Sequence, residues 1–205
     1  MTGEGRERAA TATGEADVRP ACKADARRIA ELFRISSEGV ADYIWRQLAR
    51  PGEDLLDIGQ RRYEREGVPF SWQNCTVVER SGEVVAMAHA FIMPAPTVAT
   101  PDETPDPVLR PYAELEVAGS FYLSGLAVLA EHRGRGLGTR LLRACCERAR
   151  SVQAAEVSLI CFERNQGALR LYLRAGFAPV DRREIVPHPL IQQTGDALLM
   201  TLPLR

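Results

Sequence analysis

The sequence predicts a mixed α/β fold, a layer sandwich of helices and a sheet. Hydrophobic spacing is helical in the first third of the chain, and it changes to strand-like alternation near Cys75. Strands and helices alternate only in the second half, which disfavours a doubly wound parallel sheet. The 205 residues, 45% of them hydrophobic, are enough for one domain with a substantial core.

The chain begins with a polar stretch, residues 1–16, that predicts a disordered leader before a domain spanning 17–205. A short strand is expected at 17–21, where Pro20 closes it. Apolar residues at helical spacing then predict three helices, at 24–37, 40–48 and about 53–66.

The middle of the chain predicts a hairpin and an insertion. Residues 75–80 and 83–92 alternate as strands around Ser81-Gly82, which indicates an antiparallel turn. Residues 93–119 hold five acidic residues against one arginine, and six of the 13 prolines lie between positions 93 and 111. This composition predicts an irregular, acidic surface insertion.

The second half alternates between strands and helices. The expected elements are a strand at 120–128, a helix from about Gly136, a strand at 157–162, a short helix at 166–174 ended by Gly176, and strands near 177–186 and 197–202.

Charge and cysteine content restrict the function classes. A net charge of −1 and a pI of about 6.3 provide no field that would attract nucleic acid or an anionic membrane. No apolar run approaches the roughly 18 residues of a membrane span. The five cysteines are odd in number and lack zinc-ligand spacing, and no secretory apolar segment follows the N-terminus. We therefore expect a reduced, cytoplasmic protein without a metal site.

The strongest local signal is a strand ending at Val128 that runs into Arg133-Gly134-Arg135-Gly136-Leu137-Gly138 and then a helix. Helix N-termini carry unpaired N–H groups and a positive dipole end, and glycines let the main chain approach a phosphate. The dinucleotide fingerprint fails because its third glycine would fall on Thr139. A Walker A loop is excluded because this segment contains no lysine.

The spacing Arg-x-x-Gly-x-Gly after a strand resembles motif A of the GNAT N-acetyltransferase superfamily, although Ala130 stands where proline is common. A second pattern of the family, Asn-xx-Ala-xxx-Tyr-xxx-Gly-Phe, matches downstream. The similarity extends over roughly residues 17–203. The matching downstream positions are Asn165, Ala168, Tyr172, Gly176 and Phe177.

The resemblance implies a mostly antiparallel central sheet, flanked by helices and splayed at an acyl-CoA site. It also implies acetyl-CoA as co-substrate and direct attack by a primary amine of a small molecule or a protein, without a metal. The main chain of Leu126 and Val128 would bind the pantetheine arm, with the Val128 N–H as oxyanion donor. Asn165 would contact the same arm, and Tyr172 would protonate the departing thiolate. The pyrophosphate would lie against the loop residues, which are Arg133, Gly134, Arg135, Gly136, Leu137, Gly138 and Thr139.

Several assignments have a plainer alternative. Tyr172 could be a core aromatic residue, and Asn165 suits a helix N-cap, a role that is compatible with cofactor contact. Glu114 and Glu116 precede a strand, and Glu116 is the predicted base, although both could be solvated charges. His89 is expected to be a core histidine.

Two further function classes stay open at this point. A non-catalytic acyl-CoA-binding module is the main alternative, and a nucleotide-binding protein is disfavoured by the failed spacings. The acidic stretch at 93–119 weakly favours a cationic acceptor. Homodimers are common among GNAT enzymes, but no feature of the sequence decides the oligomeric state.

Overall fold

The computed structural model describes residues 16–95 and 106–204. The predicted leader, apart from Ala16, and residues 96–105 of the predicted insertion therefore lie outside the described residues.

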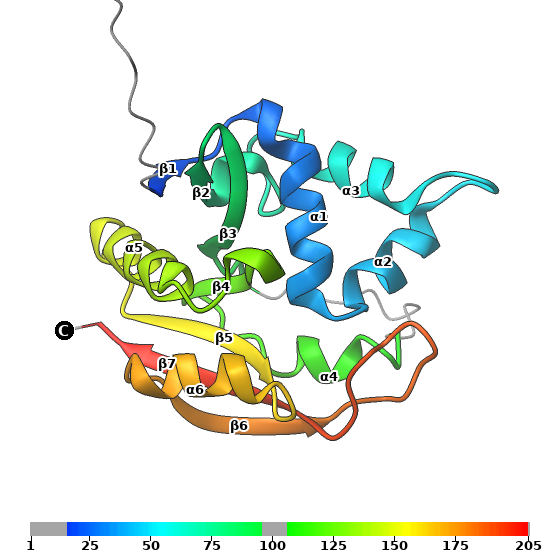
Figure 1. Cartoon of the computed structure of the whole chain (residues 1–205). Helices are drawn as coiled ribbons and strands as arrows, with labels where there is room; N and C mark the ends of the chain where they lie inside the picture. Colours follow the sequence, from blue (N-terminus) through cyan, green and yellow to red (C-terminus); the bar gives the residue numbers. More distant parts are fainter. Residues whose placement is uncertain (1–15, 96–105, 205) are drawn as a thin grey trace, which may run out of the picture.

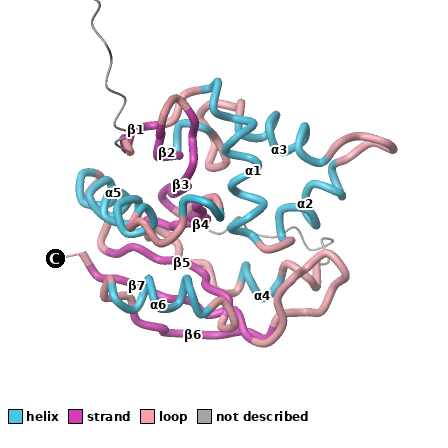
Figure 2. Tube along the Cα trace, in the orientation of Figure 1, coloured by secondary structure: helices cyan, strands magenta, loops and turns pink. Residues whose placement is uncertain are grey.

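The described residues form one seven-stranded sheet with the order β1-β2-β3-β4-β5-β7-β6 (Figures 1 and 2). All neighbouring strands are antiparallel except β4 and β5, which run parallel. This confirms the mixed, mostly antiparallel sheet. The strands are β1 (Asp17–Pro20), β2 (Cys75–Arg80), β3 (Glu83–Ile92), β4 (Phe121–Val128), β5 (Glu156–Phe162), β6 (Ala178–Glu184) and β7 (Asp196–Pro203).

Apart from α4, which lies in the segment predicted to be irregular, the α-helices agree with the expected spans to within a few residues at their ends. The α-helices are α1 (Ala26–Ser37), α2 (Val40–Leu48), α3 (Leu55–Tyr63), α4 (Arg110–Ala113), α5 (Leu137–Ser151) and α6 (Gln166–Arg174). Short 3-10 turns are η1 (Lys23–Asp25), η2 (Trp72–Asn74) and η3 (Ala130–His132).

The helices form a layer on each face of the sheet (Figure 1). Helices α5 and α6 pack on one face, where Leu141 is fully buried. Helices α1, α2 and α3 cover the opposite face beside β2, β3 and β4, with Ile29 and Trp45 in that core. Burial of each such side chain contributes about 1.5–3 kcal/mol, so both layers are needed for a stable domain.

The predicted insertion contains regular structure where it is described. Residues 110–113 form α4, and Leu115 is completely buried. Leu115 and Val108 pack with Phe162 and Leu199 in a third core cluster below β5 and β7. This part of the insertion therefore closes the sheet face that α1 to α3 leave uncovered.

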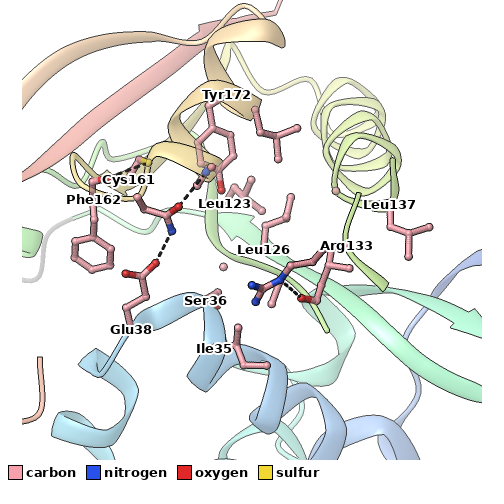
Figure 3. Close-up of a pocket in the computed structure, with 18 of the residues that line it drawn as sticks. Ile35, Ser36, Glu38, Leu123, Leu126, Arg133, Leu137, Cys161, Phe162 and Tyr172 are labelled. Carbon is pink, nitrogen blue, oxygen red and sulfur yellow. Dashed lines mark hydrogen bonds between the residues drawn. The ribbon is translucent and has the colours of Figure 1, made fainter. Parts of the chain in front are cut away.

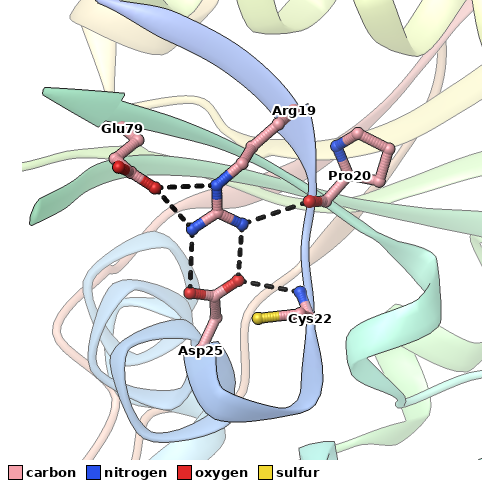
Figure 4. A network of polar contacts seen from close by, with 5 residues as sticks. All are labelled: Arg19, Pro20, Cys22, Asp25 and Glu79. Carbon is pink, nitrogen blue, oxygen red and sulfur yellow. Dashed lines mark hydrogen bonds and ion pairs between the residues drawn. The ribbon is translucent and has the colours of Figure 1, made fainter. Parts of the chain in front are cut away.

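A polar network ties β1 to the start of the first helical layer (Figure 4). The Arg19 guanidinium donates to both Asp25 oxygens, at 2.8 and 3.1 Å, and to Glu79 at 2.8 Å. Burial by itself would raise the pKa of Asp25. The hydrogen bonds from Arg19 and from the Cys22 N–H outweigh it and hold that pKa below its usual value.

All five cysteines are free thiols, and only Cys22 is exposed. Within residues 16–95 and 106–204, none of the helices combines the length and the apolar character that a membrane crossing needs.

Candidate active site

A cavity of about 1060 Å³ lies where β4 and β5 part (Figure 3). The two strands pair only between Phe121–Leu123 and Val157–Leu159. Beyond that point both continue, and the later residues of both strands line the cavity. Its volume is slightly above the ~300–1,000 Å³ typical of small-molecule sites. Because β4 and β5 stop pairing while β4 stays bonded to β3, the sheet is splayed at this point.

The main chain of β4 presents polar groups to this gap. The Leu129 N–H donates to the Val85 carbonyl at 3.0 Å. The main-chain N–H and C=O groups of the odd-numbered residues in this part of β4 therefore point to β3. Alternation along a strand then turns the N–H and C=O groups of Leu126 and Val128 away from β3 and towards the gap. The Val128 carbonyl accepts a hydrogen bond from Arg133 Nε at 3.0 Å.

The glycine-rich loop forms the next part of the wall. Gly134 and Gly136 have left-handed φ angles of 73° and 76°, and a Cβ on either would meet nothing within 4 Å. Gly136 is the N-cap of α5 and supplies no side chain, so side chains leave the first N–H groups of this 15-residue helix unclaimed. Open space in front of such a terminus suits an anion.

Helix α6 supplies the polar side chain opposite the loop. Asn165 Oδ1 accepts the Ala168 N–H at 3.0 Å, which confirms the predicted N-cap. This bond also orients the amide, because the Nδ2 group must then point the other way. Asn165 Nδ2 donates to the carboxylate of Glu38, which is labelled in Figure 3.

Tyr172, from the last turn of α6, contributes to the same wall. The residue is only 7% exposed, and its ring packs against Phe177 at 5.8 Å between centroids. Burial is the largest influence on the hydroxyl and raises the pKa of Tyr172 above its usual value. The phenol therefore stays protonated, and able to donate, throughout the neutral pH range.

Sequence reasoning missed Glu38, which follows α1. It adopts a left-handed φ of 48°, and its carboxylate accepts hydrogen bonds from the side-chain amides of Asn165 and Gln193. The next residue, Gly39, is indispensable to this turn, because a Cβ there would lie 1.8 Å from the Leu190 carbonyl oxygen. Both amide partners are more than 120 residues away in the chain, so no local pattern could have indicated this arrangement.

A buried histidine supports the cavity from behind. The pairing of β3 with β4 skips Ser124, which is a β-bulge. His89 is completely buried, and its Nε2 lies 3.0 Å from the Pro69 carbonyl, so Nε2 carries the proton. Nδ1 is then the acceptor for the Ser124 hydroxyl at 2.6 Å. Burial lowers the pKa of His89 to about 4, which confirms a neutral core histidine.

The predicted site residues do not all come together. Ten of the twelve line the cavity. These are Leu126, Val128, Arg133, Gly134, Gly136, Leu137, Gly138, Thr139, Asn165 and Tyr172. Arg135, within the same loop, is exposed and does not line the cavity. Glu116, the predicted base, is exposed on the connection between α4 and β4, outside the cavity wall, and Glu114 pairs with Arg110 and Arg183 on the surface.

The fold and sequence are similar to those of acetyltransferases. The model of the Acetyltransferase (GNAT) family matches residues 41–177, which is 137 of the 205 residues. An uncharacterized N-acetyltransferase of Bacillus subtilis, YobR, is 38% identical over 58 residues; the match spans 28% of this chain and only 24% of that relative's length.

Two solved structures share the fold over almost their whole length. An N-acetyltransferase from Staphylococcus aureus Mu50 has 19% identity and a TM-score of 0.64, with 91% of this chain and 100% of that chain covered. A putative acetyltransferase from Salmonella typhimurium, yncA, solved with its cofactor acetyl-CoA, has 20% identity and a TM-score of 0.58, with 93% and 94% covered.

Proposed function

The chain belongs to the acetyltransferase (GNAT) family, and from that premise we propose that it transfers an acetyl group from acetyl-CoA to a primary amine. One observation carries the proposal. The gap between β4 and β5, the glycine-rich loop and the N-terminus of α6 open into a single cavity. This arrangement offers main-chain donors for phosphate and a slot for an extended arm.

The loop and the start of α5 are the proposed pyrophosphate site. Anions are stabilised at a helix N-terminus by unpaired N–H groups and the dipole. The contributing residues are Arg133, Gly134, Gly136, Leu137, Gly138 and Thr139. Arg135 is exposed in the same loop and is a further proposed contact of the pyrophosphate. The pantetheine arm would follow β4, where Leu126 and Val128 turn main-chain groups to the gap, and would reach Asn165.

The reaction then needs few groups from the protein. The neutral amine nitrogen bonds to the acyl carbon, the carbon–sulfur bond breaks, and the amine releases one proton. Tyr172 is the proposed acid that protonates the departing thiolate, and the Val128 N–H is the proposed oxyanion donor. The proton from the amine returns through solvent to the Tyr172 phenolate. Glu116 stays a proposed base for this proton, although it is not among the residues that line the cavity.

A non-catalytic acyl-CoA-binding module is the alternative, and two measurements separate the proposals. Acetyl-CoA should raise the melting temperature, since a ligand at 100 times its Kd stabilises the native state by about 2.7 kcal/mol. ATP and NAD at equal concentration should do much less, and an equal response to ATP would contradict the assignment. Release of free thiol from acetyl-CoA with any member of an amine panel would establish an enzyme. Binding without turnover would favour the module.

A further inference from the structure

The C-terminal end of α1 presents hydrogen-bond acceptors to the cavity. Ser36, Glu38 and Ser124 all line it, and each has its own hydrogens committed elsewhere or has none to give. We propose that this group is a subsite for the ammonium end of a cationic, aliphatic amine acceptor. The inference rests on the proposed function and specifies its substrate class.

The two serines can only accept. The Ser36 hydroxyl donates to the Phe33 carbonyl at 3.0 Å. The Ser124 hydroxyl donates to His89 Nδ1 at 2.6 Å, and it cannot reverse, because the Pro69 carbonyl holds the proton on Nε2. Each oxygen therefore offers lone pairs to a ligand.

The two serines lie on elements that contact one another, α1 and β4. A Cβ on Gly125, the neighbour of Ser124, would lie only 2.8 Å from Ser36 Oγ. The absence of a side chain at position 125 thus lets α1 sit directly against the bulge in β4. Helix and strand together form one small polar surface in the cavity wall.

Glu38 adds a carboxylate whose only partners in the described part of the chain are neutral. It accepts from two primary amides, and no arginine, lysine or histidine of that part forms an ion pair with it. Neighbouring acids differ in this respect: Glu31 is paired with Arg28 at 2.6 Å, and Asp42 with Arg34 at 2.7 Å. Glu38 also caps the C-terminus of α1, where the helix dipole favours a cation.

Among the described residues, three arginines line the cavity. Arg34 lies on α1 itself, but Asp42 matches its charge through hydrogen bonds of 2.7 and 2.9 Å. The other two belong to other parts of the cavity. Arg133 is bonded to the Val128 carbonyl beside the glycine loop. Arg174 lies nine residues beyond Asn165, so it is about 13 Å further along α6 at 1.5 Å per residue. The wall therefore has donors for an anion at the loop end and acceptors for a cation at the α1 end.

These features select among amines. An alkyl amine is protonated at neutral pH and brings three N–H donors and a positive charge, as lysine does with a pKa of about 10.4. An aromatic amine is uncharged and brings fewer donors. An acceptor with a carboxylate or phosphate beside its amine would place like charge against Glu38.

The test uses n-butylammonium chloride as the probe, titrated at constant ionic strength into the full chain saturated with CoA. The matched ligands are n-butanol, which is neutral, and sodium butyrate, which is anionic. Wild type should bind butylammonium at least about tenfold more tightly than either, as expected for a charge-assisted hydrogen bond. Equal affinity for butanol would overturn the proposal, whatever the variants do.

Two variants then locate the subsite. Glu38→Gln should weaken butylammonium binding by at least about tenfold, and Ser124→Ala by a smaller factor. Glu31→Gln is the control, because it removes the same charge seven residues earlier, on α1, from a carboxylate already held by Arg28. An equal loss in Glu31→Gln, or no loss in Glu38→Gln, would contradict the assignment. CoA affinity, measured separately for each protein, reports on the proposed function, so failure to bind CoA is distinguishable from failure of the ammonium subsite.

Discussion

The two ends of the cavity are built in different ways. At the loop end, one continuous segment from Val128 to Thr139 supplies the strand terminus, the glycines and the start of α5. At the α1 end, Glu38, Ser124 and Asn165 come from three distant segments, and hydrogen bonds between distant residues hold them. A site formed by one segment leaves a spacing pattern in the sequence, whereas a site assembled by folding leaves none.

The largest expected effect concerns Tyr172, on the wall between the two ends. If its hydroxyl protonates the thiolate, Tyr172→Phe should lower kcat by about 10²–10⁴, the usual contribution of general-acid catalysis. CoA affinity should stay nearly unchanged, because the buried ring is retained. Steady-state kinetics measure kcat, and calorimetry measures the affinity for CoA.

The pH profile of the wild type supplies a check on this role. Since burial raises the pKa of Tyr172, ionisation of this phenol should not reduce the rate below about pH 10. A variant with full activity would show that Tyr172 is a packing residue, while the family assignment would stand.

The next effect tests whether the loop end acts on its own. Gly136→Val projects a branched side chain into the open space in front of α5, where the phosphate is proposed to bind. Loss of one or two hydrogen bonds to a charged group, about 1.5–3 kcal/mol each, should weaken acetyl-CoA binding about tenfold or more. Calorimetric titration measures the change.

Gly52→Val is the matched control for this substitution. Gly52 has a φ of 81°, and its Cβ would also meet nothing within 4 Å, but it lies on the turn between α2 and α3. Both variants should lose similar stability from a left-handed valine, about 1–2 kcal/mol. If the two also bind the cofactor equally well, Gly136 serves only to begin the helix.

The smallest expected effect is a pH dependence of folding stability. It comes from His89, which holds Ser124 at the α1 end of the cavity. His89 has a pKa of about 4 in the folded protein and about 6.5 when unfolded, so between these values the unfolded chain binds more protons. Its contribution to stability is complete above pH 6.5 and declines as the pH falls towards 4. At pH 5 the loss should be about 2 kcal/mol, since each pKa unit corresponds to 1.36 kcal/mol.

Urea unfolding of wild type and His89→Gln at pH 7 and pH 5 isolates this contribution. The difference in unfolding free energy between the two proteins should shrink by about 2 kcal/mol at pH 5. A difference that is independent of pH would mean that His89 titrates normally despite its burial. Tyr63, at 3.4 Å from Nδ1, stays neutral over this range and does not obscure the result.

Local chemistry explains which predictions succeeded. The glycine loop, the N-cap at Asn165 and the turn at Ser81-Gly82 each depend on residues within a few positions of one another. Hydrophobic spacing gave the helix and strand spans because one face of each element must be buried. Glu116 stays a predicted base, but it is not among the residues that line the cavity, because nearness to a strand in sequence does not determine which way a connecting segment faces.

By itself, the sequence determined the element order, the mixed α/β class and the strand–loop–helix segment from Val128 to Gly138, since these follow from local periodicity and backbone freedom. Only the tertiary structure decided that β7 lies between β5 and β6, that β4 and β5 part after three paired residues, and that Ser124 bulges towards His89. It also brought Glu38 to Asn165 across 127 positions. The physical reason is that strand register and long-range hydrogen bonds depend on how whole layers pack, and no short segment contains that information.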